Sequence, residues 1–373
     1  MLDRRLAAVA GLLLAIAACG DDATVTTTVP PTTTASVTSV TTTATTTTVA
    51  ATTTTTTEPV ATTTTVPFVD VLAIPEALAE MGSDWMEEVF IPYGSAETDL
   101  GTSPGGEGGL LDLGPEYGAQ GPDGTWWFLD VAKTRLARYA ADGAFLDALP
   151  IPVELLSQGV YAQFQLPRVL AGGEFVAFRL GQGSTAMMLV TEAGFEEIEI
   201  PGYVVPRVDD GATLYGFDDQ GAMVGVDPAA AVTFSVEWFM TQSGSRYRIT
   251  LVEGGLRIEL PDAPQPVDRI LPMVYAADSS VGAFAGIQVA TTADGRIHLL
   301  LTGAPESDES VQLAGYATIL PDGSVTPVTP VRNPFTPSDP GSPGQLGAAF
   351  GTDLPWLMVV DVDGIRIYRP TGG

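Results

Sequence analysis

Beyond residue 68 the chain alternates short apolar runs with glycine, proline and aspartate. The runs are rich in aromatic and β-branched residues, which favour strands, and turn-forming residues bound each of them. The clearest predicted strands are residues 126–129, 175–178, 297–301 and 356–360. One helix is predicted over residues 74–81, because Pro75 stands in its first turn and Gly82 follows its end. The pattern therefore predicts an all-β domain.

The strands recur in units that begin with a glycine-containing turn. In the unit around Gly124, a strand, a loop, a second strand, an Asp142-Gly143 turn and a third strand follow one another. Asp-Gly suits a tight hairpin because glycine accepts a positive φ. Similar units are marked by Gly124, Gly173, Gly211, Gly255, Gly295 and Asp353.

These markers are 38 to 58 residues apart. A repeat of about 40–50 residues, each forming an antiparallel sheet, is typical of a β-propeller, in which neighbouring blades bury what one blade cannot. Six markers predict six blades. A seventh blade from residues 82–118, and a β-sandwich or two smaller β domains, remain as alternatives.

Part of the first unit resembles the NHL-type propeller repeat. The resemblance covers residues 89–150 and rests on residues 89–94, 100–101, 121–130, 135–139 and 142–145. Such repeats place an aspartate after the first strand and a basic residue in the next, and Asp130 and Arg135 occupy those positions. These residues are mostly structural in NHL repeats, so the resemblance implies that Asp130 and Arg135 order a loop.

The N-terminus has the pattern of an export signal. Arg4 and Arg5 precede an apolar run, residues 7–18, that is too short to span a bilayer. Residues 14–19 resemble a bacterial lipobox, which implies that Cys19, the only cysteine, is lipidated after removal of a signal peptide at residues 1–18. A cleavage near this point without lipidation, or a buried free thiol at Cys19, are the alternatives.

Residues 19–67 predict an anchor followed by a stalk. From residue 23 onward this segment is almost entirely Thr, Val, Ala and Pro, without a periodic apolar face, so nothing offsets the entropy of ordering it. The segment is expected to be a disordered, extended spacer and a target for O-glycosylation; a tolerated low-complexity insertion is the alternative. Such a tract after a lipobox resembles lipoproteins of actinobacterial type. Residues 68–373 are then the β-propeller domain.

Charge narrows the set of partners. The net charge is −29, and Lys133 is the only lysine. Nucleic-acid binding needs clustered Lys and Arg to displace counterions, so this class is excluded. The acidity is expected to give a solvated surface; a cation site or a basic protein partner is the narrower alternative.

Candidate catalytic residues are few. His298, the only histidine, lies within an apolar strand and is expected to be a packed or surface strand residue. No nucleophile elbow or phosphate-binding loop occurs in the sequence. Aspartates that could bind calcium also stand where hairpin turns are expected, at positions Asp209, Asp210, Asp218, Asp219, Asp361 and Asp363.

Aromatic and loop residues give weaker indications of a binding surface. Trp126 and Trp127 must point to opposite faces of their strand, so one is expected in the core. The other is expected either to pack between blades or to form a binding surface. The proline-rich loop at residues 333–344 contains Asn333, the only asparagine, which a lactonase-like propeller would use beside metal-binding carboxylates.

Together these features predict a β-propeller held by Cys19 at the outer face of the cell membrane. The expected function is that of a monomeric, non-catalytic binding or scaffold module, without a cofactor or metal, for a protein, a peptide or a cell-wall glycan. A metal-assisted, lactonase-like hydrolase on the same scaffold is the alternative. A purely structural role, in which the stalk only displays the propeller, is a third hypothesis for its function.

Overall fold

The computed structural model describes residues 69–102, 114–115, 117–156, 165–180, 185–200, 202, 204–275, 284–303, 313–332 and 345–371. They belong to one compact unit, Val66–Gly373. The predicted signal peptide, Cys19, the Thr-rich segment and Asn333 lie outside the described residues. No helix among those described is long and apolar enough to cross a membrane.

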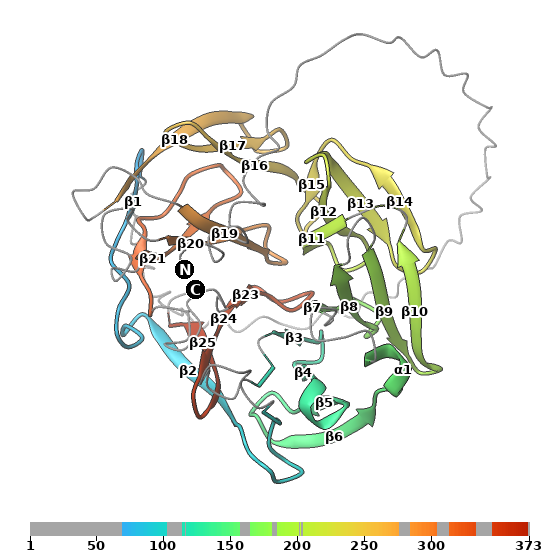
Figure 1. The fold of residues 1–373 in the computed structure, drawn as a ribbon. Coiled ribbons are helices and arrows are strands. Elements are labelled where there is room, and N and C mark those ends of the chain that lie inside the picture. Colours follow the sequence, from blue (N-terminus) through green and yellow to red (C-terminus); the bar gives the residue numbers. More distant parts are fainter. Residues whose placement is uncertain are drawn as a thin grey trace, which may run out of the picture. The chain divides into compact units, whose positions relative to one another are not determined.

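Six sheets stand around a common centre and form a six-bladed β-propeller (Figure 1). Four blades are built from four consecutive antiparallel strands, with the first strand innermost. Blade 1 consists of β3 (Gly118–Gln120), β4 (Trp126–Asp130), β5 (Arg135–Tyr139) and β6 (Phe145–Pro150). Blade 2 consists of β7 (Gln165–Val169), β8 (Phe175–Leu180), β9 (Thr185–Thr191) and β10 (Gly194–Ile200). Blade 3 consists of β11 (Val204–Asp209), β12 (Leu214–Asp218), β13 (Met223–Asp227) and β14 (Val232–Ser235). Blade 5 consists of β19 (Phe284–Thr291), β20 (Ile297–Gly303), β21 (Leu313–Ile319) and β22 (Thr329–Pro330).

The other two blades each take their outermost strand from the N-terminal part of the propeller unit. Blade 4 consists of β15 (Phe239–Met240), β16 (Arg246–Val252), β17 (Gly255–Leu260) and β18 (Val267–Tyr275), with β1 (Leu72–Ile74) added in parallel to β18. Blade 6 consists of β23 (Gln345–Gly347), β24 (Trp356–Asp361), β25 (Gly364–Pro370) and β2 (Trp85–Pro92). Strands from both ends of the domain therefore share blade 6, which closes the ring. Among the described residues, the helical elements are a short 3-10 helix (Val131–Lys133) and α1 (Val153–Leu156).

The predicted helix at residues 74–81 is wrong. The segment instead continues from β1 in an extended path, with Glu76 bridging to Leu313 and Leu78 to Arg332. Leu72 and Ile74 are fully buried against blades 4 and 5. Alternate residues thus face the core, and this burial, together with pairing to distant strands, outweighs the local signals of Pro75 and Gly82.

The glycine markers are confirmed for four of the six units. Gly124, Gly173, Gly211 and Gly295 stand in the hairpins between the first two strands, each with φ between 81° and 91°. The assignment of Gly255 is wrong, because it begins β17, and the equivalent turn holds Gly244 at φ 83°. The misplacement arose because Gly244 lies between two serines, without the aspartate that marks several of the other turns. In blade 6 the turn glycine is Gly351, two residues before the predicted marker.

The described residues of the 82–118 segment form no seventh blade, because residues 85–92 complete blade 6 and residues 118–120 begin blade 1. The core lies between the blades as a series of apolar clusters. Trp126 packs edge-on against Trp356 of blade 6, and Trp127 stacks on Phe175 of blade 2. Both tryptophans are therefore inter-blade core, so Trp127 offers no binding surface.

Candidate functional site at the propeller axis

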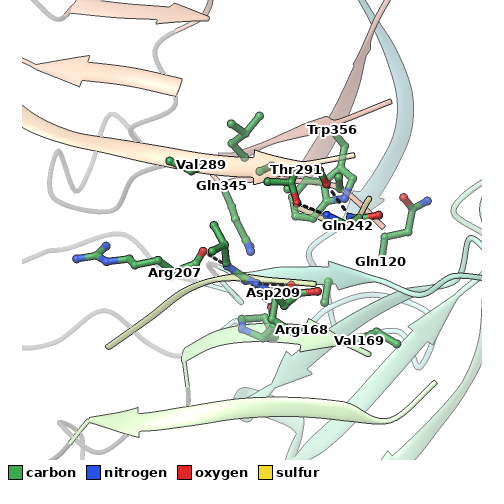
Figure 2. Close-up of a pocket in the computed structure, with 17 residues that line it drawn as sticks. Gln120, Arg168, Val169, Arg207, Asp209, Gln242, Val289, Thr291, Gln345 and Trp356 are labelled. Carbon is green, nitrogen blue, oxygen red and sulfur yellow. Dashed lines mark hydrogen bonds and ion pairs between the residues drawn. The ribbon is translucent and has the colours of Figure 1, made fainter. Parts of the chain in front are cut away.

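The innermost strands surround a small cavity on the axis (Figure 2). Residues of β3, β7, β11, β19 and β23 line it, and blade 4 contributes Gln242, which follows β15. The cavity volume is about 30 Å³. This is room for about two water molecules and is far below the roughly 300–1,000 Å³ of a small-molecule pocket.

Blade 4 contributes less to the axis than the other blades do. Its innermost strand, β15, has only two residues, and β11 of blade 3 packs directly against β19 of blade 5. Five inner strands therefore form most of the cavity wall, and Gln242, Ala348 and Trp356 complete it.

An ion pair joins blades 2 and 3 at the cavity wall. Arg168 Nε lies 3.4 Å from Asp209 Oδ2, and Arg168 Nη2 donates to the carbonyl oxygen of Arg207 at 2.9 Å. Burial raises the pKa of Asp209, and the positive charge of Arg168 partly opposes this shift. Burial likewise lowers the pKa of Arg168. Each charge thus depends on the other, and the pair links neighbouring inner strands.

Glutamines join the other inner strands. Gln242 donates to the carbonyl oxygen of Thr291 at 2.7 Å and accepts from the amide of Gly351 at 2.9 Å, which connects blade 4 to blades 5 and 6. The Gln288 side chain accepts from the amide of Leu346, and the Gln345 side chain accepts from the amide of Gly118. These polar groups hold blades together.

His298 is buried in blade 5, with 2% of its surface exposed. Its Nε2 lies 3.1 Å from Thr292 Oγ1, which donates its own proton to Asp294, so Nε2 carries a proton and donates. Its Nδ1 lies 2.7 Å from the Tyr316 hydroxyl and accepts from it. Burial lowers the pKa of His298 to about 4. The packed alternative predicted for His298 is confirmed, and the imidazole is neutral at physiological pH.

The pair predicted from the NHL resemblance orders a loop. Arg135 Nε lies 2.9 Å from Asp130 Oδ2, and the guanidinium also donates to the carbonyl oxygens of Glu97 and Asp99. Asp130 accepts from the amides of Gly101 and Lys133. Both side chains are buried, and the loop-ordering role is confirmed.

The candidate calcium ligands occupy turns and ion pairs. Asp210 and Asp218 each accept two backbone amides of their own turns, and Asp361 pairs with Arg332 and Arg366. Asp363 pairs with Arg366. Within the described ranges, no three His, Cys, Asp or Glu side chains gather in an arrangement that could hold a metal ion.

Sequence reasoning did not single out the residues that surround the axis, namely Arg168, Gln242, Gln288 and Gln345. A signal was present, because Arg168, Gln288 and Gln345 each stand among small or apolar residues at the start of a unit. That signal identifies axial residues only once it is known that the first strands of all units meet at one axis.

Fold and site thus define a six-bladed β-propeller with a narrow, polar axis. The chain belongs to the family described as Domain of unknown function (DUF7485), whose model matches residues 83–369. No curated protein matches the sequence.

Solved structures with a similar fold share little sequence with this chain. A Bacteroides fragilis protein described as exported is 10% identical with a TM-score of 0.43, covering 80% of this chain and 98% of its own. Virginiamycin B lyase from Staphylococcus aureus is 11% identical with a TM-score of 0.41, covering 78% and 97%. A streptogramin B lyase is 10% identical with a TM-score of 0.40, covering 70% and 94%.

Proposed function

We propose that this protein is an extracytoplasmic β-propeller, held at the outer face of the cell membrane by lipidated Cys19. There it acts as a non-catalytic binding or scaffold module for a protein, a peptide or a cell-wall glycan. The anchor is inferred from the lipobox-like residues 14–19, and the stalk from the Thr-rich residues that follow.

The use of polar side chains at the axis supports binding over catalysis. The axial cavity has room for about two water molecules. Its Arg168–Asp209 pair and its glutamines bond to neighbouring blades. His298 is enclosed and neutral, remote from solvent. Recognition is therefore expected on the outer surface of the blades. A metal-assisted hydrolase remains the less favoured alternative, because the described residues do not gather a set of metal ligands.

Crosslinking in intact cells tests the binding role. The full chain would be crosslinked on cells of its source organism and its partners identified by mass spectrometry, alongside a wall-glycan array. A chain cut after residue 67, which keeps only the anchor and stalk, is the control. We expect a partner that requires the propeller. Turnover of a lactone or ester panel, without any such partner, would overturn the proposal.

Cell fractionation tests the anchor separately. Cys19→Ser should move the protein from the membrane fraction to the medium, or leave an uncleaved precursor of higher mass. Cys19 has no second cysteine to substitute for it. An unchanged membrane fraction would refute lipidation at this residue.

A further inference from the structure

The outermost strand of each blade has an open edge, and most of these edges carry features that prevent pairing with another chain. Exposed edges normally carry charge, proline or a covering segment for this purpose. The edge strand β2 contains two glutamates, β6 contains Asp147 and Pro150, and β10 contains three glutamates. In blade 4, β18 is covered by the short strand β1, and in blade 5 β22 has only two residues, one of them Pro330.

Within the described residues, strand β14 of blade 3 lacks every one of these features. Its residues are Val232, Thr233, Phe234 and Ser235, without charge or proline, and it is the last strand of its sheet. Val232 is 46% exposed and Phe234 is 44% exposed. The chain has a net charge of −29, so an edge strand without charge and with two exposed apolar side chains is unusual in it. Exposed apolar surface of this kind marks interaction sites.

The hydrogen-bond register shows which backbone groups of β14 are open. The amide of Val236 donates to the carbonyl oxygen of Met223, and Phe234 lies opposite Gly225 on β13. In an antiparallel pair every second residue bonds inward, so Val232 and Phe234 bond to β13. The N–H and C=O groups of Thr233 and Ser235 therefore point to the open edge, ready to pair with an added strand.

The side chains of this edge add an apolar surface. Val232 and Phe234 share one face of the sheet, because they are two residues apart. The Phe234 ring lies over Gly225, where an added Cβ would approach it to 2.6 Å. Partly buried Met223 and Phe217 lie on the same face. An added strand would thus place its own apolar side chains beside Phe234.

Acidic residues stand at both ends of β14. Asp227 lies opposite Val232 at one end; Glu237 follows the other end, where the turn that contains Asp218 and Asp219 also lies. None of these four carboxylates forms an ion pair within the described part of the chain. By contrast, acidic residues of the other edge strands pair with arginine: Asp147 with Arg138, Glu197 with Arg179 and Glu88 with Arg369.

We propose that the open edge of β14 binds an extended peptide segment of another protein by strand addition, with β-branched or apolar residues at its centre and Lys or Arg at its ends. Main-chain bonds would supply affinity, and the side chains beside Phe234 would supply specificity. Two copies of this chain paired through β14 would bring acidic ends together, so a basic partner fits better than self-association. This inference rests on the proposed binding function and names its partner class.

Selection of peptides on matched variants tests the inference. A phage-displayed library of random linear decapeptides would be selected on the full chain, and the recovered peptides measured on variants of Thr233. Thr233→Pro removes the outward N–H without breaking a bond to β13, and proline is tolerated on edge strands. Thr233→Val keeps that N–H and is the matched control. Circular dichroism would confirm that both variants are folded.

We expect the recovered peptides to be rich in Lys or Arg, to bind at least 10-fold more weakly to Thr233→Pro than to Thr233→Val, and to weaken further with added salt. On the unmodified protein, bound peptide should slow amide hydrogen exchange at Thr233 and Ser235. Peptides that bind both variants equally and leave these amides unprotected would overturn the β14 site while leaving a binding module in place. If no peptide is recovered, the β14 proposal fails. If the crosslinking experiment also finds no partner and the ester panel is turned over, the binding function fails with it.

Discussion

The interfaces between blades and the axis that they surround are held together by opposite kinds of side chain. Between blades the contacts are apolar and aromatic, such as the edge-on pair of Trp126 and Trp356 with centroids 5.3 Å apart. At the axis the contacts are polar, with glutamine amides and one ion pair reaching from blade to blade. Apolar burial supplies most of the free energy of folding, whereas directional hydrogen bonds specify which groups meet. We infer that the interfaces set stability and that the axis sets the order and position of the inner strands.

Opening the ring should have the largest effect. Deleting residues 354–368 removes most of β24 and β25 and exposes the apolar faces of blades 1 and 5, together with two sheet edges. We expect loss of the cooperative thermal transition in calorimetry. Deleting residues 26–65, which lie outside the propeller unit, is the control and should leave the transition nearly unchanged. A stable, soluble product of the first deletion would contradict the closed ring.

Truncating a buried aromatic residue should come next. Trp126 has no exposed surface, so Trp126→Ala is expected to lower the free energy of unfolding by about 3–5 kcal/mol in denaturant titrations. Leu146→Ala in the same blade is the control, since Leu146 is half-exposed and should change stability by about 0.5 kcal/mol or less. Similar losses for the two variants would show that the blade 1 interface is not a principal source of stability.

The one histidine gives a test of a polar group inside an apolar interface. Because the pKa of His298 is lowered to about 4 from an ordinary value of 6.5, the unfolded chain binds more protons between these pH values. Stability from this residue is therefore present above pH 6.5 and lost as the pH falls toward 4, by up to about 3 kcal/mol.

Proton NMR can follow the His298 titration without overlap, because the chain has one histidine. Denaturant titrations of the parent chain and His298→Gln across this pH range give the corresponding stabilities. The variant should lack the part of the pH dependence that His298 contributes. If His298 in the folded protein titrated with a midpoint near pH 6.5, its imidazole would be solvated rather than buried.

Removing an axial glutamine should have the smallest effect. Gln242→Ala deletes the bonds to Thr291 and Gly351 and is expected to cost about 1–2 kcal/mol in the free energy of unfolding. Gln220→Ala, in an exposed turn, is the control. A loss as large as that of Trp126→Ala would place the axis on a level with the interfaces and remove the contrast between them.

Much of the fold could be predicted from local sequence. Short apolar runs and glycine turns predicted an all-β chain of six units, because a hairpin is encoded by residues close together in sequence. The same local reasoning failed at Gly244, whose turn has no aspartate beside it, and at residues 74–81, where helix signals lay in an extended segment. Asp130 and Arg135 were correctly read as structural, since both lie within the NHL-like stretch.

The arrangement of the axis could not be predicted in this way. The hydrogen-bond partners of Gln242 are 49 and 109 residues away in sequence, and the partner of Gln345 is 227 residues away. No local sequence pattern predicts contacts over such separations. The position of β1 could not be predicted from local sequence either. This strand lies at the start of the propeller unit, just before β2 of blade 6, yet it pairs with β18 of blade 4.

The sequence by itself determined the number of blades and the position of most of their turns, since these depend on the φ angles and side-chain alternation of neighbouring residues. Only the tertiary structure decided that β2 closes blade 6, that β1 covers β18, that β11 meets β19 and that β14 is the last described strand of its sheet. Those outcomes depend on which distant apolar faces and backbone edges can be buried together, and that depends on the whole ring being closed.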